Sequence, residues 1–332
     1  MTSGRAFAWV VSAAVLGCAS PSEKQPGECG WLDSPRTPAQ QTSAGPINPS
    51  AHAFKQDDGG LRILINPILR DGSPIPELRA SDLTLRVEGD LITDFTLDRV
   101  SPSNRADIDL VFAIDTAASM GWATSGVRAS VGSLVENLRA QGFDAELGGI
   151  EFSDELRTRT PIGGVAALDA WLATITPLGG GDLPSSALDA AYEAGWSFQY
   201  RRSAARYLFL ITRGGMHERD DGTECAHMSF HEAVTRVRGS IFTTLSYVDD
   251  RGARTGIAPS FFAERVGGLQ APVDRDRLDE FDLVTNTELE SIVAESYSIS
   301  VPAAALPDQY FSGSLEFSVD GAPVFLSFLA TP

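Results

Sequence analysis

The residues best placed to do chemistry follow the first strongly apolar run of the sequence. The run Leu110–Ile114 is typical of a buried parallel strand, and Asp115 and Ser119 come soon after it. Ligands of open parallel sheets bind beyond the carboxyl ends of the strands. Carboxylate and hydroxyl oxygens are also the donors that Mg²⁺ prefers. The pattern therefore predicts a ligand-binding edge.

Two later segments place polar residues at the ends of other predicted elements. Asp182 and Ser185 lie in the glycine-rich run Gly179–Ser185, directly before a predicted helix. Arg213 follows a second fully apolar strand, Tyr207–Ile211. In a parallel sheet these segments are expected at the same edge as Asp115.

Together the three segments resemble the metal-ion-dependent adhesion site of von Willebrand factor type A domains. The run Asp115–Ser119 resembles that family's D-x-S-x-S pattern, and Gly179–Ser185 resembles its second loop, in the form G-G-G-D-x-P-E. Leu208–Gly214 resembles the strand that usually ends T-D-G. The resemblance covers residues 107–294. It implies a binding surface built from the loops 115–122, 179–185 and 213–223.

Three departures from the family pattern predict a degenerate site without metal. Ala117 stands in place of a serine, Ser185 in place of a glutamate, and Arg213 in place of an acid. Two unit charges 4 Å apart interact by ~4 kcal/mol at an effective dielectric constant of 20, so Arg213 would strongly repel a divalent ion. We expect Arg213 to lie between Asp115 and Asp182 instead. The alternative is that Arg213 points into solvent and a residual Mg²⁺ site persists at Asp115, Ser119 and Asp182.

The expected binding surface is that of a protein-interaction module. Trp and Arg are frequent interface anchors, and Trp122 lies beside the first loop. Trp122 packing into the domain is the alternative. The expected ligand-binding residues are Asp115, Ser119, Trp122, Asp182, Ser185 and Arg213.

A histidine cluster offers a weaker candidate, a zinc enzyme. Cys225, His227 and His231 lie close in sequence beside Glu224, which is zinc-like spacing. Thr235 stands where H-E-x-x-H needs its second histidine, and surface histidines are the simpler interpretation. Because the sequence also contains no nucleophile elbow or phosphate loop, we expect a non-enzymatic protein. A hydrolase and a purely structural envelope protein remain as alternatives.

Strand and helix patterns alternate from Asp107 to about Ala294. Apolar runs predict buried strands, and apolar residues at helical spacing predict amphipathic helices. The predicted strands are 110–114, 143–152, 207–211 and 241–248, and the predicted helices are 127–138, 165–175, 185–197, 230–237, 259–266 and 288–294. Repeated strand–helix units favour a doubly wound, mostly parallel α/β sheet with helices on both faces.

Strand-forming residues at 61–65, and alternating apolar and polar residues elsewhere, predict strands on both sides of this α/β segment. Three fall at 61–65, 83–87 and 91–97, and three at 297–301, 315–319 and 324–329. Three strands are too few for a stable sheet. We therefore expect residues 55–106 and 295–332 to form one small antiparallel β-sandwich, with the type A domain (107–294) inserted into it. Two unrelated hairpins packing onto the α/β domain are the alternative.

The N-terminus predicts export and a lipid anchor. Residues 1–17 hold one cation, Arg5, and an apolar run too short to span a bilayer, which suits a signal peptide. The small residue before Cys18 resembles the lipobox of bacterial lipoproteins, which implies lipidation at Cys18. Ala19 implies the outer membrane, and the proline-rich stretch 18–54 predicts a disordered tether. A secreted protein cleaved nearby is the alternative.

Charge and cysteine content limit the partners. The chain has 44 acidic and 26 basic residues and a net charge of −18, which repels phosphate and excludes nucleic acid as a partner. The membrane is therefore reached through the lipid, and the expected partner is an unidentified envelope or extracellular protein. Cys29 and Cys225 share an oxidising compartment, and whether they form a disulfide is left open.

Overall fold

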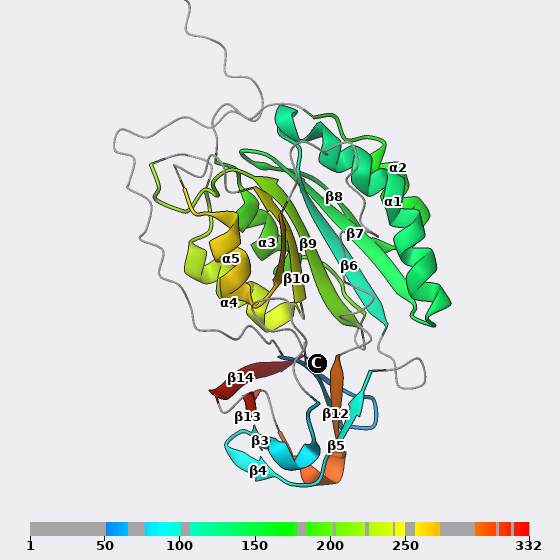
Figure 1. Ribbon diagram of the computed structural model, residues 1–332, viewed down its shortest axis with the longest axis vertical. Coiled ribbons are helices and arrows are strands. Elements are labelled where there is room, and N and C mark those ends of the chain that lie inside the picture. Colours follow the sequence, from blue (N-terminus) through cyan, green and yellow to red (C-terminus); the bar gives the residue numbers. More distant parts are fainter. Residues whose placement is uncertain are drawn as a thin grey trace, which may run out of the picture.

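The computed structural model describes two sheets, one flanked by helices and one lying at the end of the first (Figure 1). The described residues are 51–65, 77–100, 107–177, 184–201, 204–222, 226–241, 243–249, 256–272, 296–309, 312–319 and 322–331. The predicted signal peptide, the three cysteines, Asp182 and the predicted helix 288–294 lie outside them.

The six-stranded sheet is open and mostly parallel, in the order β11-β10-β9-β6-β7-β8. Only the edge strand β8 runs antiparallel to its neighbour. The strands are β6 (Ile108–Asp115), β7 (Ala145–Phe152), β8 (Leu156–Gly163), β9 (Ala205–Arg213), β10 (Thr243–Asp249) and β11 (Leu269–Pro272).

Helices cover both faces of this sheet, because strands buried on both sides need a partner on each (Figure 1). One core cluster lies under α1 (Gly121–Ala140) and α2 (Val165–Leu172). A second lies under α3 (Ala187–Trp196), α4 (Phe230–Ser240) and α5 (Pro259–Val266). The predicted doubly wound α/β class is confirmed.

The eight-stranded sheet joins strands from both ends of the chain, in the order β4-β3-β13-β14-β1-β2-β12-β5. The strands are β1 (Ala51–Lys55), β2 (Leu61–Ile65), β3 (Thr84–Val87), β4 (Asp90–Ile92), β5 (Thr96–Arg99), β12 (Tyr297–Val301), β13 (Ser312–Val319) and β14 (Ala322–Thr331). Strands of both flanks contribute to one hydrophobic cluster. The α/β segment is thus inserted into a mostly antiparallel β unit, in which only β1 and β14 pair in parallel.

The two units share apolar contacts. Phe54, Leu64 and Val100 belong to the same core cluster as Ile108 and Leu110 at the start of β6. Short 3-10 helices complete the described structure at Ala80–Asp82, Ala118–Met120 and Ala303–Ala305. None of the described helices has the length and apolarity needed to cross a bilayer.

Several predicted boundaries were wrong. Residues 51–54, assigned to the tether, belong to β1, whose Ala-His-Ala-Phe run is buried on both faces but has no β-branched residue to signal a strand. The predicted strand 91–97 is two strands, β4 and β5, separated by residues 93–95. Strands β8 and β11 were missed, and β8 because its mainly polar, exposed sequence resembles a loop.

Two adjacent glycines in β7 leave room for an aromatic side chain on each face of the sheet. A Cβ at Gly149 would overlap the indole of Trp171, which packs from α2. On the opposite face, a Cβ at Gly148 would lie 2.7 Å from Cε1 of Phe198. The Trp171 Nε1–H donates to Thr158 Oγ1 at 3.0 Å, which fixes the ring in place.

We predict that Gly149→Ala destabilises the protein, because the added methyl group must displace a hydrogen-bonded indole. The expected loss is about 1–3 kcal/mol in the free energy of unfolding, measured by denaturant titration. Gly132→Ala in α1 is the matched control, since a Cβ there meets no atom within 4 Å. It should stabilise by about 0.5–1 kcal/mol. Equal effects of the two substitutions would contradict this packing.

Candidate functional site

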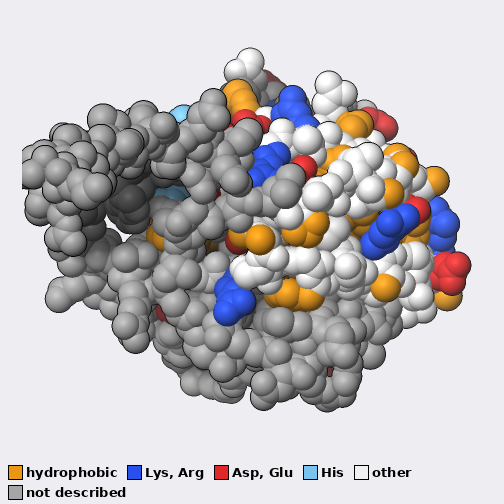
Figure 2. All heavy atoms as spheres, turned by 90° about the horizontal axis from the view of Figure 1, so that it is seen from above, with side chains coloured by type: hydrophobic (Ala, Val, Ile, Leu, Met, Phe, Trp, Pro, Cys, Tyr) orange, Lys and Arg blue, Asp and Glu red, His pale blue; other side chains and the backbone are white. Residues whose placement is uncertain are grey.

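The candidate site lies at the carboxyl edge of the parallel sheet. In-register pairing places the end of β6 between the ends of β7 and β9, with Asp115 opposite Phe152 and Ile114 opposite Ile211. Figure 2 looks onto the molecule from this side, where apolar and charged side chains are interspersed on the described surface. We call the following set the rim: Asp115, Ser119, Ser153, Asp154, Ser185, Thr212 and Arg213.

Asp115 is buried, and donors of the protein itself occupy both of its oxygens. Only 2% of the residue is exposed. Its Oδ1 accepts a hydrogen bond from the Ala117 N–H at 3.0 Å, and its Oδ2 accepts one from Thr212 Oγ1 at 3.0 Å. The Arg213 backbone N–H also donates to this carboxylate. A buried carboxylate is costly unless it is bonded in this way.

Ser185 extends this arrangement into a chain of hydroxyl groups. Its Oγ lies 3.1 Å from Thr212 Oγ1. Thr212 has one hydroxyl proton, which it gives to Asp115, so Ser185 must donate to Thr212. The backbone of Ser185 is fixed by bonds to the loop after β9, from its N–H to Gly215 O at 2.9 Å and from the His217 N–H to its carbonyl at 2.8 Å. The chain Ser185–Thr212–Asp115 therefore links the segment before α3 to β9 and β6.

Burial raises the pKa of Asp115 to about 6. The hydrogen bonds from Ala117, Thr212 and Arg213 oppose this shift, and the nearby Asp154 carboxylate adds to it. Asp154 is itself only 2% exposed. Two buried carboxylates of like charge thus lie within electrostatic reach at the rim.

The described rim residues supply an incomplete ligand set for a magnesium centre. Mg²⁺ requires near-octahedral oxygen ligands at about 2.1 Å. The Asp115 oxygens already accept internal bonds, Ala117 has no hydroxyl, and Ser119 lies exposed on the 3-10 turn. Within the described ranges, no three His, Cys, Asp or Glu side chains are grouped as a metal site. Asp182, which the sequence also offers as a ligand, lies outside those ranges.

The predicted site residues divide into three groups. Asp115, Ser185 and the backbone of Arg213 come together at the rim. Trp122 is half-buried and packs against the core cluster under α1. The predicted position of the Arg213 side chain between Asp115 and Asp182 stays a prediction, because Asp182 is not described and the bond from Arg213 to Asp115 comes from its backbone N–H.

Sequence reasoning missed the end of β7. Ser153 and Asp154 directly follow that strand and are buried. The Ser186 hydroxyl donates to the Asp154 carbonyl, and the Ser186 N–H donates to the Ser153 carbonyl at 2.7 Å. These bonds tie β7 to the start of α3. The rule that identified Asp115, a polar residue after an apolar strand, would have identified both.

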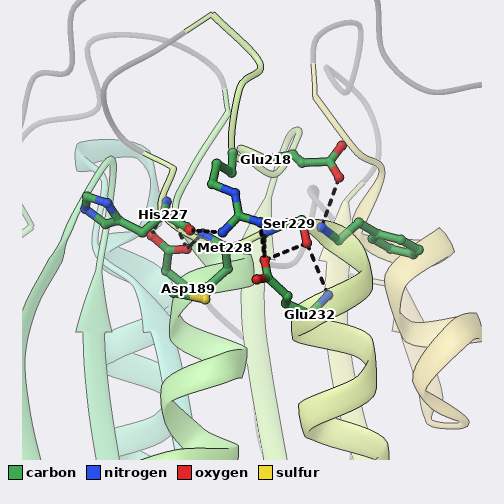
Figure 3. A network of polar contacts seen from close by, with 8 residues as sticks. Asp189, Glu218, His227, Met228, Ser229 and Glu232 are labelled. Carbon is green, nitrogen blue, oxygen red and sulfur yellow. Dashed lines mark hydrogen bonds and ion pairs between the residues drawn. The ribbon is translucent and has the colours of Figure 1, made fainter.

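A second polar cluster fixes the loop between β9 and α4 (Figure 3). Asp189 of α3 is buried and accepts the backbone N–H groups of His227 and Met228, at 3.1 and 2.8 Å. Burial raises the pKa of Asp189, and these two bonds oppose the shift. Because its partners are backbone amides, this carboxylate anchors the loop to α3.

The start of α4 is capped within the same cluster. Ser229 and Glu232 form a capping box, and these hydrogen bonds lower the pKa of Glu232 to about 2. The side chains of His227 and His231 are both exposed. The geometry fits surface histidines beside a helix cap, and Cys225, the third residue of the candidate zinc cluster, is not described.

Comparisons with known proteins give only distant similarities. No protein-family model and no curated protein matches the sequence. Among solved structures, the chain is similar to the conserved hypothetical protein BatB from Bacteroides thetaiotaomicron, at 16% identity and a TM-score of 0.38, over 56% of this chain and 98% of that one.

Two further structures are also distantly similar. Proximal thread matrix protein 1 from the mussel byssus has 13% identity and a TM-score of 0.42, over 61% of this chain and 49% of that one. The vWF domain of the type V pili tip protein Mfa5 from Porphyromonas gingivalis has 16% identity and a TM-score of 0.28, over 33% of this chain and 39% of that one. At these scores the similarities say nothing about a shared ligand or partner.

We predict that Asp115→Asn becomes increasingly stabilising as the pH rises from about 4 to about 6. The folded-state pKa of about 6 exceeds the ordinary 3.8, so ionisation of the wild-type carboxyl weakens the fold across this window. The stability gap between variant and wild type should grow by about 3 kcal/mol in total.

Denaturant titrations across this pH range measure the gap, with Asp169→Asn at an exposed carboxylate of α2 as the control. A gap that shrinks as the pH rises would mean that the ionised form of Asp115 is the stabilised one.

Proposed function

We propose that this chain is a non-enzymatic protein-binding module, anchored to the cell envelope by a lipid, that binds its partner at the rim without a metal ion. The observation that carries the proposal is the state of Asp115. Hydroxyl and amide donors of the protein itself bond to both oxygens of this carboxylate. The fold supplies loops at one sheet edge, which is a common place for ligands.

The residues around Asp115 favour binding without metal. Arg213 brings a permanent cation to the end of β9, where the resembled family has an acid. A partner that presents a carboxylate could bind the guanidinium directly, although the guanidinium cannot fully serve both Asp115 and an incoming acid. The contact would be modest in strength because the guanidinium is shared.

The lipid anchor follows from the N-terminal sequence. An apolar run too short to span a bilayer ends at Cys18, and a proline-rich stretch precedes β1. With a net charge of −18, the chain has no electrostatic attraction to anionic headgroups. Acyl chains on Cys18 would supply the membrane attachment instead. The Ala19 signal favours the outer membrane.

Site-specific photo-crosslinking in intact cells tests the rim as the binding surface. A photoreactive residue at Ala118, which is exposed beside Asp115, should give a discrete protein adduct. The same residue at Arg139 is the matched control, because it is exposed at the other end of α1. The adduct should persist in chelator, since no metal is required.

Introducing Arg213→Asp should weaken that adduct by about tenfold, because it replaces the attracting cation with a repelling acid. An adduct that vanishes in chelator and returns with Mg²⁺ would overturn the metal-independent mechanism. Equal adducts from positions 118 and 139 would overturn the rim as the binding surface.

We predict that Cys18→Ser removes the anchor. The variant should lose incorporation of a labelled fatty acid and leave the membrane fraction or remain unprocessed, as judged by fractionation and mass spectrometry. Cys29→Ser is the matched control and should remain lipidated and membrane-bound. Normal processing and membrane association of Cys18→Ser would show that no lipid is attached there.

A further inference from the structure

An arginine lies against two aromatic rings on the outer layer of helices. The Arg236 guanidinium of α4 is centred 4.5 Å from the ring centroid of Trp196 and 5.4 Å from that of Tyr192, both in α3. Trp196 is 63% exposed, although large apolar side chains are normally covered. We call Tyr192, Trp196 and Arg236 the aromatic–arginine site.

A glycine makes this arrangement possible. A Cβ at Gly195 would lie 2.7 Å from Cγ of Arg236. Glycine at this position lets the aliphatic stem of Arg236 cross α3 closely, which places the guanidinium beside both rings. The site is thus held by packing between two helices rather than by a mobile loop.

The guanidinium has no oxygen acceptor within the described part of the chain, where its contacts are the two π faces. Some other arginines there bond to carboxylates: Arg201 bonds to Asp109 at 2.8 Å, and Arg219 to Glu232 at 2.8 Å. Stacking covers a guanidinium's faces but leaves its in-plane N–H donors available. A positioned cation with available N–H donors can bind an incoming carboxylate. The exposed indole beside it can contact an apolar group.

We propose that the aromatic–arginine site docks a segment of a partner protein in which an Asp or Glu lies next to an apolar side chain. The carboxylate would take the Arg236 donors, and the apolar neighbour would cover Trp196. The net charge of −18 disfavours polyanions such as nucleic acid and anionic membranes, whereas a single carboxylate faces a local cation.

This site is separate from the rim. The helix α3 begins beside Ser185 and Ser186 at the rim, and Trp196 is its last residue. Ten helical residues at 1.5 Å each place the two sites about 15 Å apart along the helix axis. The proposal therefore stands or falls independently of binding at the rim.

A random-peptide display selection against the purified full-length protein tests the proposal. Peptides are eluted by competition with free protein and then measured individually by fluorescence polarisation. The selected peptides should share an acidic residue beside an apolar one. They should bind Arg236→Met and Trp196→Ala at least about tenfold more weakly than wild type.

Two controls separate binding from folding and from general charge. Arg236→Met keeps the unbranched stem over Gly195, and thermal unfolding checks that the variant is folded. Arg238→Met removes an exposed cation from the same helix without touching the rings, and it should bind the peptides as wild type does. Peptides that lack an acid, or that bind Arg236→Met as tightly as wild type, would overturn the proposal. So would an equal loss in Arg238→Met.

Discussion

The hydrogen bonds to one buried carboxylate organise the carboxyl edge of the parallel sheet. Asp115 ends a strand whose eight residues are all buried, so its charge lies at the boundary between core and surface. Ala117, Thr212 and the backbone of Arg213 supply its hydrogen bonds, and Ser185 supports Thr212. Because these donors come from different elements, the loops after β6 and β9 and the start of α3 are held in one arrangement.

A second buried carboxylate, at the other end of the same strand, is stabilised in a different way. Asp109 lies near the start of β6 and is also buried, and there Arg201 supplies both a backbone N–H and a side-chain bond, at 2.7 and 2.8 Å. Arg201 also forms an ion pair with Asp144, so one guanidinium contacts two carboxylates at that end of the sheet. A permanent cation neutralises Asp109, whereas hydroxyl and amide dipoles hold Asp115. The second arrangement leaves a titratable group at the rim.

Much of the fold was predictable from the sequence. Strands that are buried on both faces have continuous apolar runs, whereas strands and helices that are buried on one face have periodic apolar residues. The all-apolar interior of β6, the helical spacing in α1, the strand-forming residues of β2 and the alternation in β12 each identified an element. Strand β1 was missed because alanine and histidine carry little strand preference, and β8 because its side chains are largely exposed. The pairing of β12 with β2 joins segments that are far apart in the sequence, so the local pattern of either segment does not indicate it.

The candidate site was predictable in position but not in its bonding. The rule that ligands bind beyond the ends of parallel strands located Asp115, Ser185 and Arg213. It could not show that Thr212 bonds to Asp115, since that depends on the register between β6 and β9. Nor could it show that Trp122 packs against the core, because a tryptophan at the first turn of a helix has the same local sequence whether it faces inward or outward.

The ionisation of Asp115 is the most direct test of this account. Its side-chain carboxyl ¹³C shift can be followed by NMR through a pH titration, with and without millimolar Mg²⁺. The account predicts a midpoint at about pH 6 that Mg²⁺ leaves unchanged, because internal donors and burial set it. A midpoint that Mg²⁺ lowers would show that a cation binds this carboxylate, and a midpoint below the ordinary value of 3.8 would show that burial does not control its ionisation; either result would contradict the account.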